Sequence, residues 1–513
     1  MRRRLAVILG LVCLLAILVA CGDTAPPLTP LPRATQLAQL TEVAGRLTAT
    51  AAAPKPTTAP TETPVVTPVA RRATPAPGKG AFVPTADTPC RLAGYQRPLP
   101  EQPATVDTVE QAYRCLLLHY VDGATVDDRA LLDGAWSAVA AGGKGRYLDA
   151  ALAPLALTGD READWRTFAA RFAALAPDMS AVETTRLARA AVGGMADGLN
   201  DNHVAYLDPR HWQSAYPDEV GLAVFPSAGF EVALDEASGK FYLYVVFRGG
   251  PAARAGLRAG DVIERVGGHA VGRDADNRAL YDLLVGLPGT GDTVEVTRPV
   301  GGQTLSVLIA VDEVEVPLID VAVLPGNVGY LRLRYFSLDA GEEFDSALAT
   351  LQQRGIRSLV IDVRENGGGS VDALVHIASH LTHTGPLAVT IQPDGRRVPV
   401  QPDTRVPLLN LPFAVLTDDA SASSSEVLAA VARDRGGRVI GVKTAGALGG
   451  ARFYELADGS ALEITEERVL GPDGEEINGV GVTPDTVVPF GPADFSSGDD
   501  PPLRRAEQEL AAH

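Results

Sequence analysis

The chain has 513 residues, a formal net charge of −18 and a pI near 4.9. This length leaves room for two to four domains with cores of their own. An acidic surface repels phosphate groups, so the composition argues against nucleic acid as a partner.

The first residues have the pattern of an export signal. Arg2–Arg4 precede an uninterrupted apolar run, Leu5–Ala20, which is too short for a comfortable transmembrane helix. The run ends in Leu18-Val19-Ala20-Cys21-Gly22, which resembles the lipobox of bacterial lipoproteins. The resemblance implies a signal over residues 1–21, a lipid on Cys21 and an extracytoplasmic protein anchored to the membrane. A plain signal anchor or ordinary secretion is the alternative.

The four cysteines differ in their expected fates. Cys13 would leave with the signal and Cys21 would carry the lipid, so Cys90 and Cys115 remain in the folded part. An even pair in an oxidising compartment favours a disulfide between them. Two buried free thiols are the alternative.

Residues 22–88 are rich in Thr, Pro and Ala, as in Pro54-Lys55-Pro56-Thr57. Such a segment cannot bury enough apolar surface to fold, and its prolines keep it extended. We therefore expect a disordered linker that holds the folded part away from the membrane.

Residues 89–216 are expected to form a helical region. Apolar residues recur there at intervals of three and four, at Val109, Ala112, Tyr113, Leu116 and Leu117. Further helices are predicted near residues 129–140, behind Asp127 as N-cap, and over residues 181–199. The segment Asn200-Asp201-Asn202-His203 follows the last of them.

Short strands replace helices from residue 218. The run Gly250-Pro251-Ala252-Ala253-Arg254-Ala255-Gly256-Leu257, followed by Gly260-Asp261-Val262-Ile263, resembles a PDZ domain of the bacterial protease type. We place this domain at residues 217–313. The resemblance implies a groove at a strand edge that accepts a peptide tail as an added strand. Its carboxylate-binding loop would be Gly221, Leu222 and Ala223.

Strands and helices alternate over residues 314–490, and residues 491–513 are taken as a C-terminal tail. The buried strand Leu359–Val363 runs into Arg364-Glu365-Asn366-Gly367-Gly368-Gly369. A strand, a glycine loop and a helix can hold phosphate. The Gly-Lys-Ser/Thr ending of a nucleotide-binding loop is missing, so no nucleotide cofactor is expected.

A second strand leads into a cluster of hydroxyl residues. Pro412–Leu416 is followed by Thr417-Asp418-Asp419-Ala420-Ser421-Ala422-Ser423-Ser424-Ser425, and good helix formers begin at Glu426. A serine at a strand-to-helix turn lies beside the unpaired N–H groups of the helix start. These donors can stabilise the oxyanion of an acyl-transfer intermediate. Taken alone, the cluster can also simply cap the helix.

The order of these segments resembles the C-terminal processing peptidases, or tail-specific proteases. The resemblance covers roughly residues 105–490 and includes Gly479-Val480-Gly481-Val482-Thr483-Pro484-Asp485. It implies a mixed α/β, crotonase-like core and a serine endopeptidase that acts on polypeptide tails without a cofactor. It also implies Ser423 as the nucleophile, with an oxyanion hole formed by the N–H groups of Ser424 and Gly368.

One departure from this family concerns the base that activates the serine. The typical member has a lysine in a Thr-x-Gly-Lys stretch, where this chain reads Thr444-Ala445-Gly446-Ala447. Since an isolated hydroxyl is a poor nucleophile at neutral pH, another group must act on Ser423. His203 resembles the histidine of the tricorn-like and retinoid-binding-protein-like branches, and its ordinary pKa suits a general base. Lys443 is the alternative, although a strand should direct it elsewhere.

A histidine base usually has a third group that fixes its tautomer. The related branches have a glutamate shortly before the closing turn, where this chain has Asn478, with Glu475 and Glu476 nearby. The departures at Ala447 and Asn478 keep a second hypothesis open, in which the chain is a catalytically inactive PDZ lipoprotein. Such a protein would bind C-termini as a scaffold or a sensor.

Three further histidines are spaced by four and three residues on or just past a predicted helix, namely His376, His380 and His383. This spacing can suggest a metal-binding face. No carboxylate or cysteine is spaced to complete such a site. We therefore predict that these histidines are structural and that no metal is bound.

Overall fold

The computed structural model describes residues 85–511 apart from 86, 95–96, 145–150, 176–178, 214–223, 236, 274, 276 and 285–287. The predicted signal with Cys21, most of the predicted linker, and Gly221, Leu222 and Ala223 lie outside the described residues. Within the described part of the chain, no helix combines the length and the hydrophobicity of a membrane span.

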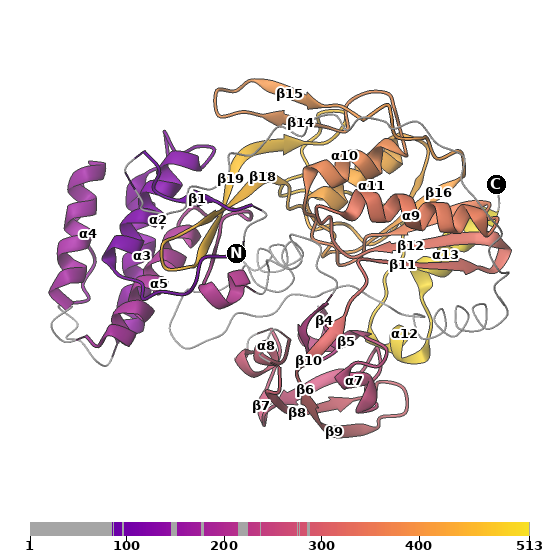
Figure 1. Cartoon of the computed structure of the whole chain (residues 1–513), viewed down its shortest axis with the longest axis horizontal. Coiled ribbons are helices and arrows are strands. Elements are labelled where there is room, and N and C mark those ends of the chain that lie inside the picture. Colours follow the sequence, from indigo (N-terminus) through magenta and orange to yellow (C-terminus); the bar gives the residue numbers. More distant parts are fainter. Residues whose placement is uncertain are drawn as a thin grey trace, which may run out of the picture.

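The N-terminal region contains the described helices α2 (Val106–His119), α3 (Asp128–Gly143), α4 (Arg161–Leu175) and α5 (Ala181–Asp197). Helices α3 and α5 pack closely because glycines face each other: a Cβ on Gly194 would lie 2.4 Å from the carbonyl oxygen of Gly134. This packing fixes the end of α5, and His203 follows shortly after it. Figure 1 shows these helices as a separate layer beside the sheets.

An antiparallel sheet lies between these helices and the rest of the molecule. Its strands are β1 (Arg91–Leu92), β18 (Gly449–Glu455), β19 (Ala461–Leu470), β14 (Ala388–Ile391) and β15 (Arg397–Val400), in this order. Strand β2 (Ala205–Leu207) pairs with β19. His203 lies two residues before β2 and is therefore held at this sheet. A disulfide joins Cys90, beside β1, to Cys115 in α2.

A second antiparallel sheet forms a body of its own below the core in Figure 1. Its order is β4 (Phe230–Asp235), β5 (Lys240–Val246), β6 (Val262–Val266), β8 (Gly291–Thr297) and β9 (Thr304–Ala310), with β7 (His269–Ala270) on β6. Helices α7 (Pro251–Arg254) and α8 (Arg278–Leu284) belong to the same body. Strands β3 (Val224–Ser227) and β10 (Asp312–Glu315) pair where the chain enters and leaves it.

The core is a six-stranded sheet made of β11 (Ile319–Leu324), β12 (Val328–Leu333), β13 (Ser358–Asp362), β16 (Phe413–Thr417), β17 (Arg438–Gly441) and β20 (Thr486–Val487). The β11–β12 pair is antiparallel and the other pairs are parallel. Side chains of α9 (Ala340–Gln353), α10 (Val371–Ser379) and α11 (Ser424–Asp434) pack in one hydrophobic core with this sheet. The predicted mixed α/β class is confirmed.

The parallel core strands bring two loops together. Strand β13 ends at Asp362 and β16 ends at Thr417, and the two strands are paired neighbours. Because parallel neighbours end at the same edge of a sheet, the glycine loop after β13 and the serine turn after β16 lie side by side.

The C-terminal residues contain two helices, α12 (Pro492–Ser497) and α13 (Pro501–Ala511). Helix α13 packs against the other face of the core sheet. Just before it, Asp500 binds the buried Arg364 through two hydrogen bonds of 2.9 and 2.8 Å. Arg364 also binds Asp362, so this segment holds the start of the glycine loop.

Candidate active site

Ser423 lies at the turn between β16 and α11 and has a strained backbone. Its φ of 52° and ψ of −117° are rare for a residue with a side chain. Its N–H donates to the Ala447 carbonyl oxygen at 2.7 Å and to Glu426 Oε2 at 3.1 Å. Strained strand-to-helix turns of this kind present a nucleophilic serine at the edge of a sheet.

The glycine loop is joined to this turn by several hydrogen bonds. Ser424 Oγ donates to the Gly369 carbonyl oxygen at 3.0 Å, and Ser425 Oγ donates to that of Asn366 at 2.7 Å. The backbone N–H of Ser424 has no acceptor among the described residues and belongs to the first turn of α11. It is therefore available for a negatively charged oxygen.

The other predicted oxyanion donor, Gly368, is engaged within the protein. Its N–H donates to Asn366 Oδ1 at 2.8 Å. The amide of Asn366 is itself oriented, because its Nδ2 donates to the Leu333 carbonyl oxygen at 2.9 Å. An oxyanion bound at Gly368 would have to share or replace the Asn366 contact.

His203 is buried, with 3% of its surface exposed, and its tautomer follows from one contact. Its Nδ1 lies 3.0 Å from Asn202 Oδ1. Because an amide oxygen only accepts hydrogen bonds, Nδ1 carries the proton and Nε2 keeps its lone pair. Burial lowers the pKa of His203 to about 4, although the negative charge of Asp201 acts in the opposite direction. The ring is therefore neutral at pH 7 and able to accept a proton.

Asn202 connects His203 to Asn478. Its Nδ2 donates to Asn478 Oδ1 at 3.0 Å and to the Gly446 carbonyl oxygen at 3.3 Å. Asn478 Oδ1 also accepts the Leu448 N–H at 3.3 Å. Asn478 is thus hydrogen-bonded to Asn202 rather than to the imidazole of His203. The sequence reasoning missed Asn202, and the only available signal was its place next to His203.

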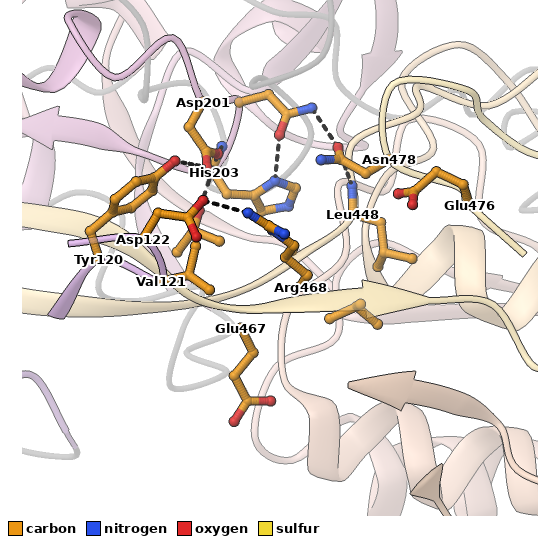
Figure 2. Close-up of a pocket in the computed structure, with 14 residues that line it drawn as sticks. Tyr120, Val121, Asp122, Asp201, His203, Leu448, Glu467, Arg468, Glu476 and Asn478 are labelled. Atoms are coloured by element: carbon orange, nitrogen blue, oxygen red, sulfur yellow. Dashed lines mark hydrogen bonds and ion pairs between the residues drawn. The ribbon is translucent and has the colours of Figure 1, made fainter. Parts of the chain in front are cut away.

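Asn202, His203 and Asn478 line a cavity of about 90 Å³, and Glu476 is also part of its lining (Figure 2). Gly449 is part of its wall, and a Cβ there would lie 3.2 Å from Cγ of His203. Ser423 does not line this cavity. In the described part of the chain, no hydrogen bond joins Ser423 Oγ to His203.

The loop from Thr444 to Gly449 lies between Ser423 and His203. At one end its Ala447 carbonyl oxygen accepts a hydrogen bond from the Ser423 N–H. At the other end Gly449 lies so near the His203 ring that an added Cβ would be 3.2 Å from it. The structure therefore brings Ser423 and His203 to the two sides of one short loop.

Glu426 fixes this loop to the serine turn. Its buried carboxylate accepts hydrogen bonds from Thr444 Oγ1 (2.6 Å), Gly446 N (2.7 Å), Ala447 N (2.8 Å) and Ser423 N (3.1 Å). Burial raises the pKa of Glu426 to about 7, and these four hydrogen bonds oppose the shift. From the sequence Glu426 could be placed only at the start of the helix, because its partners Thr444, Gly446 and Ala447 lie 18 to 21 residues away.

The structure separates the two candidate bases. Lys443 is exposed, and no hydrogen bond or ion pair among the described residues involves it. Ala447, where the sequence resemblance would place a lysine, is 2% exposed and offers only a methyl group. Neither residue is hydrogen-bonded to Ser423 Oγ in the described part of the chain, so the choice of His203 over Lys443 as the base stays a prediction.

Two family models match the chain. Residues 327–488 match the model of peptidase family S41, and residues 244–285 match the model of a PDZ domain. The probable CtpA-like serine protease of Staphylococcus aureus (strain N315) is 28% identical over 309 residues, which cover 60% of this chain and 61% of that protein. The chloroplastic C-terminal processing peptidase of Tetradesmus obliquus is 32% identical over 306 residues, 56% of this chain and 65% of that protein.

A solved structure, that of a photosystem II D1 C-terminal processing protease, is also similar. It is 26% identical with a TM-score of 0.48, and the match covers 75% of this chain and 93% of that one. The chain spans about three fifths of the length of the curated relatives that it matches.

Proposed function

We propose that the chain is a serine endopeptidase, because residues 327–488 match the model of peptidase family S41 and residues 244–285 match that of a PDZ domain. Its substrates are unfolded or C-terminal polypeptide segments, which the PDZ domain captures as an added strand. The observation that carries the proposal is the strained turn at Ser423, beside which the Ser424 N–H in the first turn of α11 has no acceptor among the described residues.

The chemistry follows from the groups around this turn. Ser423 Oγ attacks the carbonyl carbon of the peptide bond while His203 Nε2 takes the hydroxyl proton. The Ser424 N–H stabilises the oxyanion that forms. When the intermediate collapses, the C–N bond breaks, the amine leaves with the proton from His203, and Ser423 carries the acyl group. Water, deprotonated by the same imidazole, then releases the acid.

Substrate binding has to bring Nε2 of His203 within hydrogen-bond reach of Ser423 Oγ, because the two are not bonded in the free protein. Catalytic hydrogen bonds are often long in the absence of substrate and become shorter in the complex. The loop from Thr444 to Gly449 is bonded to Ser423 at Ala447 and lies beside His203 at Gly449, so its movement controls this approach.

The protein is further proposed to be extracytoplasmic and anchored by a lipid on Cys21. The signal pattern of residues 1–21 supports this location. The disulfide between Cys90 and Cys115 supports it independently, since disulfides persist in oxidising compartments. In a bacterial host the full chain should fractionate with membranes, and Cys21→Ser should remain unprocessed. Release of the unaltered chain as an ordinary secreted protein would refute the anchor.

The enzymatic proposal is tested by labelling with a serine-directed fluorophosphonate. The protein should be labelled at one site, and Ser423→Ala should abolish the label. Ser346→Ala, which alters an exposed serine on α9, is the matched control and should be labelled like the parent. A label that survives Ser423→Ala would contradict the assignment of the nucleophile.

A second candidate function is that of an inactive PDZ lipoprotein which binds protein C-termini. Two observations favour it: the Gly368 N–H is occupied by Asn366, and Ser423 Oγ is not bonded to His203. If neither the full chain nor a form without residues 217–313 is labelled or cleaves an unstructured peptide, this second function replaces the first.

A further inference from the structure

Helices α9 and α10 lie next to each other over the core sheet (Figure 1) and bring together two histidines and a carboxylate. His376 Nε2 lies 3.0 Å from Asp345 Oδ2, and His380 Nε2 lies 2.7 Å from Asp345 Oδ1. No carboxylate close to these histidines in the sequence is spaced to complete a site on this face. Asp345 supplies it from α9, 31 residues before His376.

The hydrogen bonding of His380 determines which of its atoms faces the carboxylate. Its Nδ1 lies 2.8 Å from the Pro407 carbonyl oxygen, which can only accept, so Nδ1 carries a proton. In the neutral ring Nε2 then has a lone pair directed at Asp345, and a carboxylate has no hydrogen to offer it. This contact therefore needs either a second proton on the ring or a cation between the two atoms.

A metal ion fits the arrangement of donors. Histidines that bind metals usually donate their other N–H to a backbone carbonyl or a carboxylate, as His380 does to Pro407. The three candidate ligand atoms all lie within 4.8 Å of one another. In a tetrahedral zinc site with bonds of about 2.0–2.1 Å, ligand atoms are roughly 3.3 Å apart. The observed contacts of 2.7 and 3.0 Å need only a small outward movement of Asp345, whose side chain is 46% exposed.

We propose that Asp345, His376 and His380 bind one Zn²⁺ ion. Two neutral imidazoles and one carboxylate are suitable ligands for a divalent transition metal. The fourth position faces solvent, because the side chains of His376 and Asp345 are 32% and 46% exposed, whereas that of His380 is 4% exposed. Water completes the coordination.

The ion stabilises the pairing of α9 with α10. Helix α10 begins at Val371, directly after the glycine loop, and His380 follows its last residue. At 1.5 Å per residue, His380 lies about 14 Å along the chain from the start of the helix. The zinc site is therefore at the end of α10 that is remote from the glycine loop. Its expected effect is on stability, since a ligand that binds only the folded state raises the melting temperature.

Zinc binding to the full chain, prepared without a histidine tag and dialysed free of metal, tests this proposal. Calorimetric titration should give one Zn²⁺ per chain, and Co²⁺ at the same site should show the visible absorption of tetrahedral coordination. Asp345→Asn and His376→Ala should each weaken zinc binding at least tenfold and remove the zinc-dependent rise in melting temperature. Circular dichroism checks that both variants are folded. If His376→Ala does not fold, Asp345→Asn decides the question, because it keeps the shape of the side chain.

His383→Ala is the matched control, because this third histidine binds the Val406 carbonyl oxygen instead of Asp345. It should bind zinc like the parent protein. Absence of zinc binding by the parent would overturn the proposal and leave Asp345 in ion pairs with the two histidines. Equal binding by the parent and both ligand variants would overturn it as well.

Discussion

Burial of His203 determines the pH range in which it can act as a base. Its pKa of about 4 in the folded protein lies below the ordinary value of about 6.5. Between these two pH values the folded protein binds fewer protons at His203 than the unfolded chain does. Lowering the pH through this range therefore destabilises the fold, and raising it above about 6.5 brings no further change from this residue.

The same shift predicts the acid limb of the activity. With a neutral base down to about pH 4, kcat/KM for an unstructured peptide should fall only near that pH. Initial rates between pH 3.5 and pH 8 test this, with circular dichroism at each pH to exclude unfolding. A fall in kcat/KM near pH 6.5, the ordinary histidine pKa, would mean that the free enzyme exposes His203 to water.

Asn202 is predicted to act by positioning His203. Its Oδ1 accepts the Nδ1 proton, so Asn202→Ala removes the contact that selects the tautomer. We expect kcat to fall by about 10²-fold or more with little change in KM. Asn202→Asp keeps an acceptor for Nδ1 and should recover part of the activity. An Asn202→Ala enzyme with the parent kcat would exclude the positioning role.

The disulfide between Cys90 and Cys115 joins α2 to the segment that leads into β1. It links cysteines 25 residues apart, and closing a loop of this length typically adds about 3 kcal/mol to the free energy of unfolding. Urea unfolding of the Cys90→Ser, Cys115→Ser double variant should show this loss, and the reduced parent protein should behave like the variant. Unchanged midpoints would show that the cross-link does not constrain the unfolded chain.

Elements with local signals were predicted well from the sequence. The helices expected near residues 129–140 and 181–199 are Asp128–Gly143 and Ala181–Asp197. Asp127 and Ser180 cap them as polar residues commonly do. The serine turn was also recognisable, because a strand, small hydroxyl residues and helix formers follow one another directly.

Contacts between distant segments could not be predicted in this way. Asn202 and Asn478 are 276 residues apart, and Asp345 meets His380 from another helix. Nothing in the local pattern of either partner indicates the other, since only the packing of the elements brings them together. The occupied Gly368 N–H likewise depends on the orientation of a single amide, that of Asn366.

In the whole molecule, the body formed by β4–β9 is joined to the core near the glycine loop. The buried Arg334 contacts Glu231 of β4 at 3.3 Å and Asp320 of β11 at 2.5 Å. Two residues later, the Phe336 N–H donates to the Gly368 carbonyl oxygen at 2.8 Å. One short stretch of chain after β12 thus contacts both the β4–β9 body and the loop beside Ser423.

In the proposed mechanism Ser423 and His203, which come from distant parts of the chain, act as one catalytic unit. The most direct test measures cleavage of an unstructured peptide by Ser423→Ala, His203→Ala and the double variant, with Lys443→Ala as the control. Each single variant should lose activity, and the double variant should be no worse than either, since members of one unit are not additive. Lys443→Ala should keep most of the activity, because that side chain is exposed. An active His203→Ala enzyme together with an inactive Lys443→Ala enzyme would show instead that Lys443, and not His203, is the base.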